Sequence, residues 1–113
     1  MKNFSILIPN YNYGRFLKST LSSLSVSAKF SSMPVLVTVS DNNSTDDSIS
    51  IIKTFSGSFD DFKLNINKRN IGFLGNLIEI SKLSFDGWRI LLSSDDVIYE
   101  NTLSIYSNII NQH

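Results

Sequence analysis

The chain has 113 residues and 42% hydrophobic content, which suits one small globular domain with a modest core. Ten basic and ten acidic residues cancel, so no polybasic nucleic-acid-binding surface is expected. Cysteine is absent, which excludes disulfides and thiolate metal sites. No charged leader with an apolar core precedes the first predicted strand, and no apolar run reaches the ~18 residues of a membrane helix. We therefore expect a cytoplasmic protein.

Apolar runs alternate with helical patterns along the chain. The run at 4–8 is continuous, as in a strand covered on both faces, and Pro9 is predicted to end it. Apolar residues at helical spacing predict a helix over 15–25, and a β-branched run predicts a strand at 35–39. Ser44 is the predicted N-cap of the next helix. The remaining predicted elements are a weaker edge strand at 63–67, a turn at 70–72, a helix at 73–83, a strand at 88–92 and a helix after Asn101.

Four strand–helix units in a row favour an α/β fold with a mainly parallel sheet of about four strands. The carboxyl ends of parallel strands meet at one edge of the sheet, where ligands bind. Three predicted strands end in polar clusters, which are Asn10-Tyr11-Asn12, Ser40 to Asp46 and Ser93 to Asp96.

These clusters suit a nucleotide diphosphate held through a divalent metal. Asp95 and Asp96 follow a strand of buried type, and Mg²⁺ or Mn²⁺ often uses one or two carboxylates together with substrate phosphates. Adjacent acids in extended chain point in different directions, so one can take the metal while the other accepts a hydrogen bond from a sugar hydroxyl. The alternative is that the pair merely caps the following turn.

The other two clusters are candidates for contact with a nucleobase. Asp41 and Asn42 offer fixed donors and acceptors for a base edge, or alternatively form an Asx-turn before the next helix. The ring of Tyr11 can cover a base, or pack as a partly exposed loop residue. The basic residues near the same rim, which could meet phosphates or remain solvated, are Arg15, Lys68 and Arg69.

The sequence lacks the residues that several other mechanisms require. No GxGxxG follows the first strand and no GxxxxGK[ST] is present, which disfavours dinucleotide and P-loop sites. The only histidine is His113, so a histidine triad or zinc site is implausible. A phosphoacceptor receiver is disfavoured because the first strand ends in Pro9-Asn10 and not in acids.

In this order, the motifs resemble the amino-terminal half of a family 2 glycosyltransferase with the GT-A fold. The family typically has a Pro-x-Tyr-Asn element, here 9–12, and an Asp-Asp-Gly-Ser-Thr-Asp element, here 41–46. An Asn-x-Gly turn at 70–72 and an Asp-x-Asp region, here 93–96, follow. The resemblance covers all 113 residues. Two segments, NIGFLGN and LLSSDD, are similar to the corresponding segments of enzymes that build bacterial surface polysaccharides such as O-antigen.

The resemblance implies a Rossmann-like, three-layer α/β/α domain with a nucleotide-sugar site. Within it, Tyr11 would line the base pocket, Asn42 would face the base edge and Asp41 would support the same loop. Asp96, with Asp95, would bind Mn²⁺ or Mg²⁺. The full set of nucleotide-sugar-binding residues implied is Pro9, Asn10, Tyr11, Asp41, Asn42, Asn70 and Asp95.

The implied full-length enzyme is inverting and metal-assisted. It would move a sugar from a UDP-, dTDP- or CDP-linked donor to a saccharide or lipid-linked acceptor, as a peripheral protein at the inner face of the membrane. Its acceptor-binding half and acidic general base would lie beyond residue 113. We therefore expect the 113-residue chain to be inactive alone, and to self-associate through apolar surface that the absent half would cover.

Two positions depart from the family pattern. Asn42 is neutral where many members carry Asp, and Ser93 replaces the first acid of the Asp-x-Asp element. The alternative function is a non-catalytic module, which would bind nucleotide weakly or act in protein interactions while sharing only the sheet.

Overall fold

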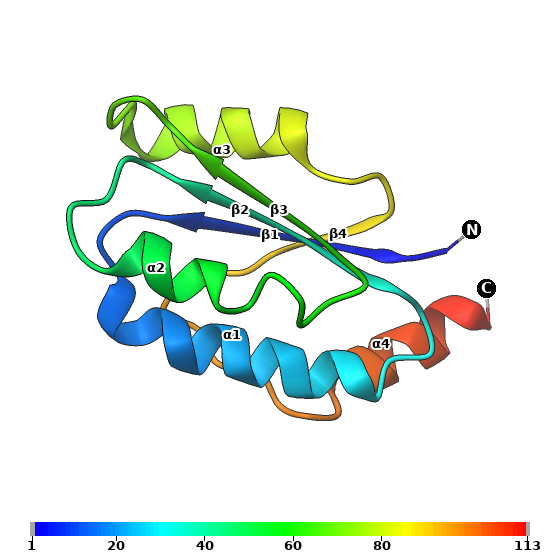
Figure 1. Cartoon of the computed structure of the whole chain (residues 1–113). Helices are drawn as coiled ribbons and strands as arrows, with labels where there is room; N and C mark the ends of the chain where they lie inside the picture. The colour runs from blue at the N-terminus through cyan, green and yellow to red at the C-terminus, as the bar shows by residue number, and fades with distance from the viewer. Residues whose placement is uncertain (1, 113) are drawn as a thin grey trace.

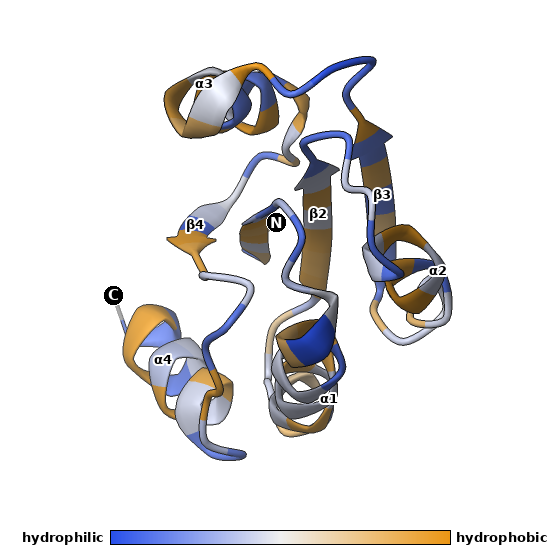
Figure 2. Cartoon of the chain, turned by 90° about the vertical axis from the view of Figure 1, so that its left-hand side faces the viewer, coloured by the Kyte–Doolittle hydropathy of each residue, from blue (hydrophilic) through white to orange (hydrophobic). Residues whose placement is uncertain are grey.

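A computed structural model, which describes residues 2–112, has a four-stranded parallel sheet between two helical layers (Figure 1). Helices α1, α2 and α4 cover one face, and α3 covers the other (Figure 2). The predicted three-layer α/β/α fold is confirmed. The elements are β1 (Phe4–Asn10), α1 (Gly14–Lys29), β2 (Val35–Asp41), α2 (Ser48–Lys53), β3 (Asp61–Ile66), α3 (Gly72–Leu83), β4 (Trp88–Leu91) and α4 (Thr102–Asn111).

The strand order β3-β2-β1-β4 puts β1 and β2 in the centre of the sheet. Every residue of β1 is buried, as the continuous apolar run predicts. The core lies mainly between these central strands and α1, where Leu17, Leu21 and Leu24 are almost completely buried. Apolar residues at this spacing occupy one face of a helix, so the packing of α1 follows directly from its sequence.

Pro9 does not end the first strand, contrary to the prediction. Strand β1 runs on to Asn10, whose carbonyl accepts the Asn42 N–H at 2.9 Å. Phe4 donates its N–H toward β2, and alternate residues of a strand face the same neighbour, so position 9 faces β4. Pairing with β4 has already ended there, at Leu7 and Leu91. Proline lacks a backbone N–H, but at position 9 no neighbouring strand would accept one, so no strand hydrogen bond is lost.

The predicted N-cap at Ser44 is also wrong, because α2 begins four residues later at Ser48. The Ser44 hydroxyl instead donates to Asp41 Oδ1 at 2.7 Å and accepts the Asn12 N–H at 2.9 Å. The carboxylate that caps the starts of α1 and α2 is that of Asp46. Its two oxygens accept the Gly14 N–H at the start of α1 and the Ser48 N–H at the start of α2, both at 2.9 Å. One side chain thus caps two helices.

Glycine at position 14 leaves room for the carboxylates of Asp46 and Asp47, which a Cβ there would displace. Partial burial raises the pKa of Asp46, but hydrogen bonds from Ser48 and Gly14 outweigh this, so the pKa falls below its ordinary value of 3.8. A carboxyl whose pKa is lower in the folded state stabilises the fold above its unfolded pKa. That stability is lost as the pH falls through the folded pKa.

We expect Asp46→Asn to lower the free energy of unfolding by about 1 kcal/mol at pH 7, because an amide offers only one oxygen to two helix starts. The difference from the wild type should shrink as the pH falls below 3.8, where Asp46 itself becomes protonated. Urea unfolding at pH 7 and pH 3 measures both effects. Asp47→Asn is the matched control, since no hydrogen bond to the Asp47 carboxylate is present within residues 2–112. Equal effects of the two variants would contradict the double cap.

Candidate nucleotide-sugar site

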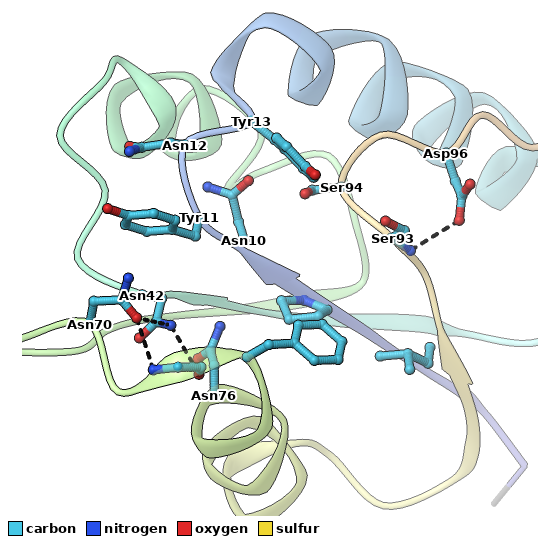
Figure 3. A pocket seen from close by; sticks show the side chains of 14 residues that line it. Asn10, Tyr11, Asn12, Tyr13, Asn42, Asn70, Asn76, Ser93, Ser94 and Asp96 are labelled. Atoms are coloured by element: carbon cyan, nitrogen blue, oxygen red, sulfur yellow. Dashed lines mark hydrogen bonds between the residues drawn. The ribbon is translucent and has the colours of Figure 1, made fainter.

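One cleft of about 720 Å³ opens at the carboxyl ends of β1, β2 and β4, beside the start of α3. This volume lies within the ~300–1,000 Å³ typical of small-molecule sites. Figure 3 shows Tyr11, Asn42 and Asn70 at one end of the cleft and Ser93 and Asp96 at the other. The lining residues are Pro9, Asn10, Tyr11, Asn12, Tyr13, Asn42, Asn70, Gly72, Phe73, Asn76, Leu91, Ser93, Ser94 and Asp96.

Most of the residues predicted from the sequence meet in this cleft, although they come from four separate segments. The parallel sheet brings them together, because its strands all end at the same edge. Asp41 and Asp95 are the two predicted site residues that do not line it. Those that do are Pro9, Asn10, Tyr11, Asn42, Asn70 and Asp96.

The side chain of Asn42 is 3% exposed, and all of its hydrogen-bonding capacity is used within the protein. Its Oδ1 accepts the Ile71 N–H at 2.9 Å and Asn67 Nδ2 at 3.1 Å. Its Nδ2 donates to Asn70 Oδ1 at 2.8 Å and to the Gly72 carbonyl at 3.1 Å. The two backbone partners fix which amide atom is which, since an N–H only donates and a carbonyl only accepts. Pairing with a base edge would break one of these bonds.

Asn42 therefore holds the 70–72 turn at the mouth of the cleft. Asn70 Oδ1 also accepts the Gly72 N–H at 2.8 Å, so its oxygen is turned toward the protein. No hydrogen bond engages Asn70 Nδ2 within residues 2–112. At the mouth of the cleft, Asn70 thus has an amide donor to spare and Asn42 has none.

Asp41 lies completely buried beneath the rim. Its carboxylate accepts Asn10 Nδ2 at 2.9 Å, the Ser44 N–H at 2.8 Å and the Ser44 hydroxyl at 2.7 Å. These bonds join the loops that follow β1 and β2, which agrees with a supporting role for Asp41. They also fix Asn10 with its Nδ2 toward Asp41. Asn10 Oδ1 is left buried with no hydrogen-bond partner in the described part of the chain.

The acidic pair divides as expected for neighbouring residues. Asp95 Oδ1 accepts the Ser93 hydroxyl at 2.6 Å and lies outside the cleft lining. Asp96 lines the cleft, and its Oδ2 accepts the Ser93 N–H at 3.1 Å (Figure 3). The second oxygen of Asp96 has no hydrogen bond within residues 2–112 and is available to a ligand.

Asp96 is the only carboxylate among the lining residues, and no lysine or arginine is among them. Arg15, predicted as a possible phosphate contact, instead places its guanidinium 4.6 Å from the ring centre of Phe16. Within residues 2–112, no three His, Cys, Asp or Glu residues lie close enough to form a metal site by themselves. One carboxylate nonetheless fits Mg²⁺ or Mn²⁺ when the ligand's phosphates supply further oxygens, as these ions commonly bind.

Sequence reasoning missed several lining residues. Tyr13 and Phe73 lie at the starts of α1 and α3. From the sequence, Tyr13 is an ordinary loop position and Phe73 an ordinary helix position. Asn76 belongs to the NIGFLGN segment that resembles the family, but it was given no role in the site; it is 2% exposed, and its Nδ2 donates to the Ser40 carbonyl at 2.9 Å. An asparagine on the apolar face of a predicted helix is the one signal that could have revealed it.

Comparison with known proteins identifies the class to which this fold and cleft belong. A sequence model of glycosyl transferase family 2 matches residues 5–112, so the chain belongs to this family. It is similar to an uncharacterized glycosyltransferase of Mycoplasma genitalium, MG060, at 27% identity over 90% of the chain. The Mycoplasma pneumoniae homolog is 31% identical over 94% of the chain. The matches cover 35% and 36% of those proteins, so the chain spans about a third of their length.

The solved structures similar to this chain have the GT-A architecture. The structure of S. aureus TarS 1-349 in complex with UDP superposes with a TM-score of 0.84 at 26% identity, over 100% of this chain and 33% of that one. A complex of the same protein with UDP-GlcNAc gives 0.79 at 25% identity, over 100% and 32%. The mannosyltransferase PcManGT from Pyrobaculum calidifontis, in complex with GDP-Man and Mn²⁺, shares the fold with a TM-score of 0.76 at 15% identity, over 96% and 31%.

The comparisons confirm the predicted family and fold. None of the helices within residues 2–112 is both long and apolar enough to cross a lipid bilayer.

Proposed function

We propose that this chain is the donor-binding part of an inverting glycosyltransferase, and that its cleft binds a nucleotide-diphosphate sugar. The observation that carries the proposal is the meeting of Tyr11, Asn70 and Asp96 around a single cleft. Such a ligand needs an exposed ring for its base, a spare amide donor and a carboxylate for the metal. The UDP and UDP-GlcNAc complexes of TarS support this ligand class.

In this proposal the two ends of the cleft have different tasks. Tyr11 covers the base, with Pro9 and Asn10 beside it, and Asn42 acts by holding Asn70. Asp96 holds Mn²⁺ or Mg²⁺, which would neutralise the diphosphate and act as a Lewis acid toward the leaving group. The absence of a lining lysine or arginine supports a metal as the main counter-charge.

Transfer of the sugar needs groups beyond those in this cleft. A hydroxyl of a saccharide or lipid-linked acceptor would lose its proton to an acidic general base and attack the anomeric carbon. We place that base and the acceptor site outside these 113 residues. The support is that Asp96 is the single lining carboxylate and that the chain spans about a third of its relatives.

The test is calorimetric titration with UDP, dTDP and CDP, with and without Mn²⁺. We expect at least one nucleotide to bind, and Mn²⁺ to raise its affinity about tenfold, a free energy of about 1.4 kcal/mol. Asp96→Ala should remove this metal-dependent gain and leave the metal-independent affinity nearly unchanged. A chain that binds none of the three nucleotides would instead favour the non-catalytic interaction module.

Two further variants sharpen this titration. Asp86→Ala makes the same charge change at a carboxylate outside the cleft, and it should leave the gain intact. Asp95→Ala tests the predicted hydrogen bond between Asp95 and a sugar hydroxyl. Because the Asp95 carboxylate accepts a bond from Ser93 outside the cleft lining, we expect a smaller loss than for Asp96→Ala. Loss of the gain in Asp86→Ala would show that general electrostatics, and not a metal ligand, cause the effect.

A further inference from the structure

One buried side chain of the cleft carries an acceptor that makes no hydrogen bond within residues 2–112. Asn10 is 2% exposed and lines the cleft, and its Oδ1 has no partner there. The other buried atoms of the same residues without a partner are hydroxyl oxygens outside the cleft lining, on Ser5, Thr38 and Ser48. A hydroxyl rotates to suit its surroundings, whereas an amide oxygen is fixed by the partners of its own nitrogen. Asn10 Oδ1 therefore needs a donor from elsewhere.

The orientation of the Asn10 amide is set by Asp41. Asn10 Nδ2 donates to Asp41 Oδ1 at 2.9 Å and to the Ser44 hydroxyl at 3.4 Å. Asp41 also accepts the N–H and the hydroxyl of Ser44, and an ionised carboxylate only accepts. A reversed amide would set its oxygen against this carboxylate, which is completely buried. The oxygen of Asn10 must therefore lie on the side away from Asp41.

This oxygen lies between the two ends of the cleft. Figure 3 shows Asn10 with Tyr11 on one side and Ser94 and Asp96 on the other, and the Asn10 oxygen is on the side of Ser94. Thr20 holds the Ser94 carbonyl, and no hydrogen bond engages the Ser94 hydroxyl within residues 2–112. In the proposed function the base lies at Tyr11 and the diphosphate at Asp96. The ribose joins these two groups chemically, so it must pass Asn10.

We propose that Asn10 Oδ1 accepts a hydrogen bond from a ribose hydroxyl, and that the cleft thereby selects ribonucleoside diphosphates over their deoxy analogues. This inference rests on the proposed function, because it needs a nucleotide in the cleft. A ribose hydroxyl can donate to Asn10 and accept from the Ser94 hydroxyl, which matches the spare capacity of both side chains. An N–H of the base is the other donor that a nucleotide offers. The base belongs to the Tyr11 end, however, and the Asn10 oxygen is on the opposite side (Figure 3).

This contact should contribute more than a polar contact at an open surface. Asn10 Oδ1 is buried from solvent, so the incoming hydroxyl displaces no water from it. A buried acceptor without a partner is unfavourable, and a donor from the ligand removes that cost on binding. Tyr13 also lines the cleft and reaches toward Ser94 beside this oxygen (Figure 3). Its side chain is 39% exposed and can turn aside to admit the ribose.

The test is calorimetric titration, with Mn²⁺ present, of UDP and CDP and of the 2′-deoxy and 3′-deoxy analogues of whichever binds. We expect one of the two analogues to bind about tenfold or more weakly than its parent. Equal affinity of the parent and both analogues would overturn this proposal and leave the proposed function standing. If neither UDP nor CDP binds, this proposal fails, and the proposed function fails with it only if dTDP does not bind either.

Variants show whether Asn10 causes the preference. Asn10→Ala should lower the affinity for the parent nucleotide to that for the sensitive analogue, so that the preference disappears. Because Asn10 also anchors Asp41, the matched control is Ser44→Ala, which removes a hydrogen bond to the same carboxylate and keeps Asn10 Oδ1. Its preference should remain about tenfold.

Asp95→Ala distinguishes Asn10 from the other candidate for contact with a sugar hydroxyl. The Asp95 carboxylate lies outside the cleft lining, so this variant should keep the preference. A preference that survives in Asn10→Ala, or that is lost in Asp95→Ala, would refute the assignment. Should Asn10→Ala fail to fold, the wild type and Asp95→Ala still test the proposal with the same analogues.

Discussion

Asn42→Asp is expected to lower the free energy of unfolding by about 3 kcal/mol at pH 7, because two partly buried acceptors lose their donor and a carboxylate takes its place at a position that is 3% exposed. The new carboxylate can still accept the bonds from Ile71 and Asn67. Its other oxygen would face Asn70 Oδ1 and the Gly72 carbonyl, to which the amide donates at 2.8 and 3.1 Å. Three oxygens without a proton between them repel one another in a site that is almost closed to water.

The pH dependence of this variant has a definite sign. Protonation of the new carboxyl restores one donor, so the folded state holds its proton more tightly than the unfolded state does. The stability of Asn42→Asp relative to the wild type should therefore improve as the pH falls from 7 toward 4, as chemical unfolding at both values would measure.

Asn43→Asp is the control, because it makes the same change at the next, exposed residue and should alter stability by less than about 0.5 kcal/mol. If the Asn42 amide instead reads a base edge directly, Asn42→Asp would change nucleotide preference without loss of stability. That result would refute its role as the anchor of the 70–72 turn.

Tyr11→Ala is expected to weaken nucleotide binding about 10- to 100-fold, since stacking of a base on an aromatic ring contributes ~1–3 kcal/mol. Tyr11 lines the cleft and is 44% exposed, so its ring is accessible to a ligand and contributes little to the core. The unfolding midpoint should therefore hardly change, which separates a lost contact from a damaged fold. Calorimetric titration with the best-binding nucleotide measures the loss.

Tyr11→Phe keeps the ring and removes only the hydroxyl, so its affinity should remain within about threefold of the wild type. A similar loss in both variants would mean that the hydroxyl, and not the face of the ring, makes the contact. Unchanged affinity in Tyr11→Ala would place the base elsewhere in the cleft, and would remove the main support for assigning the base to this end.

Much of the fold follows from local pattern. The continuous run in β1, the β-branched run in β2 and the helical spacing in α1 predict their elements because each depends on nearby residues alone. The gathering of Tyr11, Asn70 and Asp96 also follows, since parallel strands end at one edge. Family membership agrees with the four motifs read in order along the chain.

The details that sequence did not reveal depend on partners far apart in the chain. The Ser44 hydroxyl accepts the N–H of Asn12, 32 residues away, so the local cap signal at Ser44 pointed to a residue that is engaged with another loop. Asn42 has the amide side chain expected of a residue that recognises the edge of a base. Whether its amide is free depends on Asn67 and the 70–72 turn, which lie at least 25 residues further on. A spacing rule cannot detect that an amide is already saturated.

The interlocked loops after β1 and β2 have a thermodynamic consequence for the cleft. Asn12 donates its N–H to Ser44 and accepts the Thr45 N–H at 2.8 Å, so this rim is rigid before any ligand arrives. At the opposite rim, the hydrogen bonds that Asp95 and Asp96 make are all to Ser93. Thr20 of α1 also holds the Ser94 carbonyl, so the conformational entropy lost on binding should fall mainly on the side chains of the acidic rim, while the aromatic rim is preorganised.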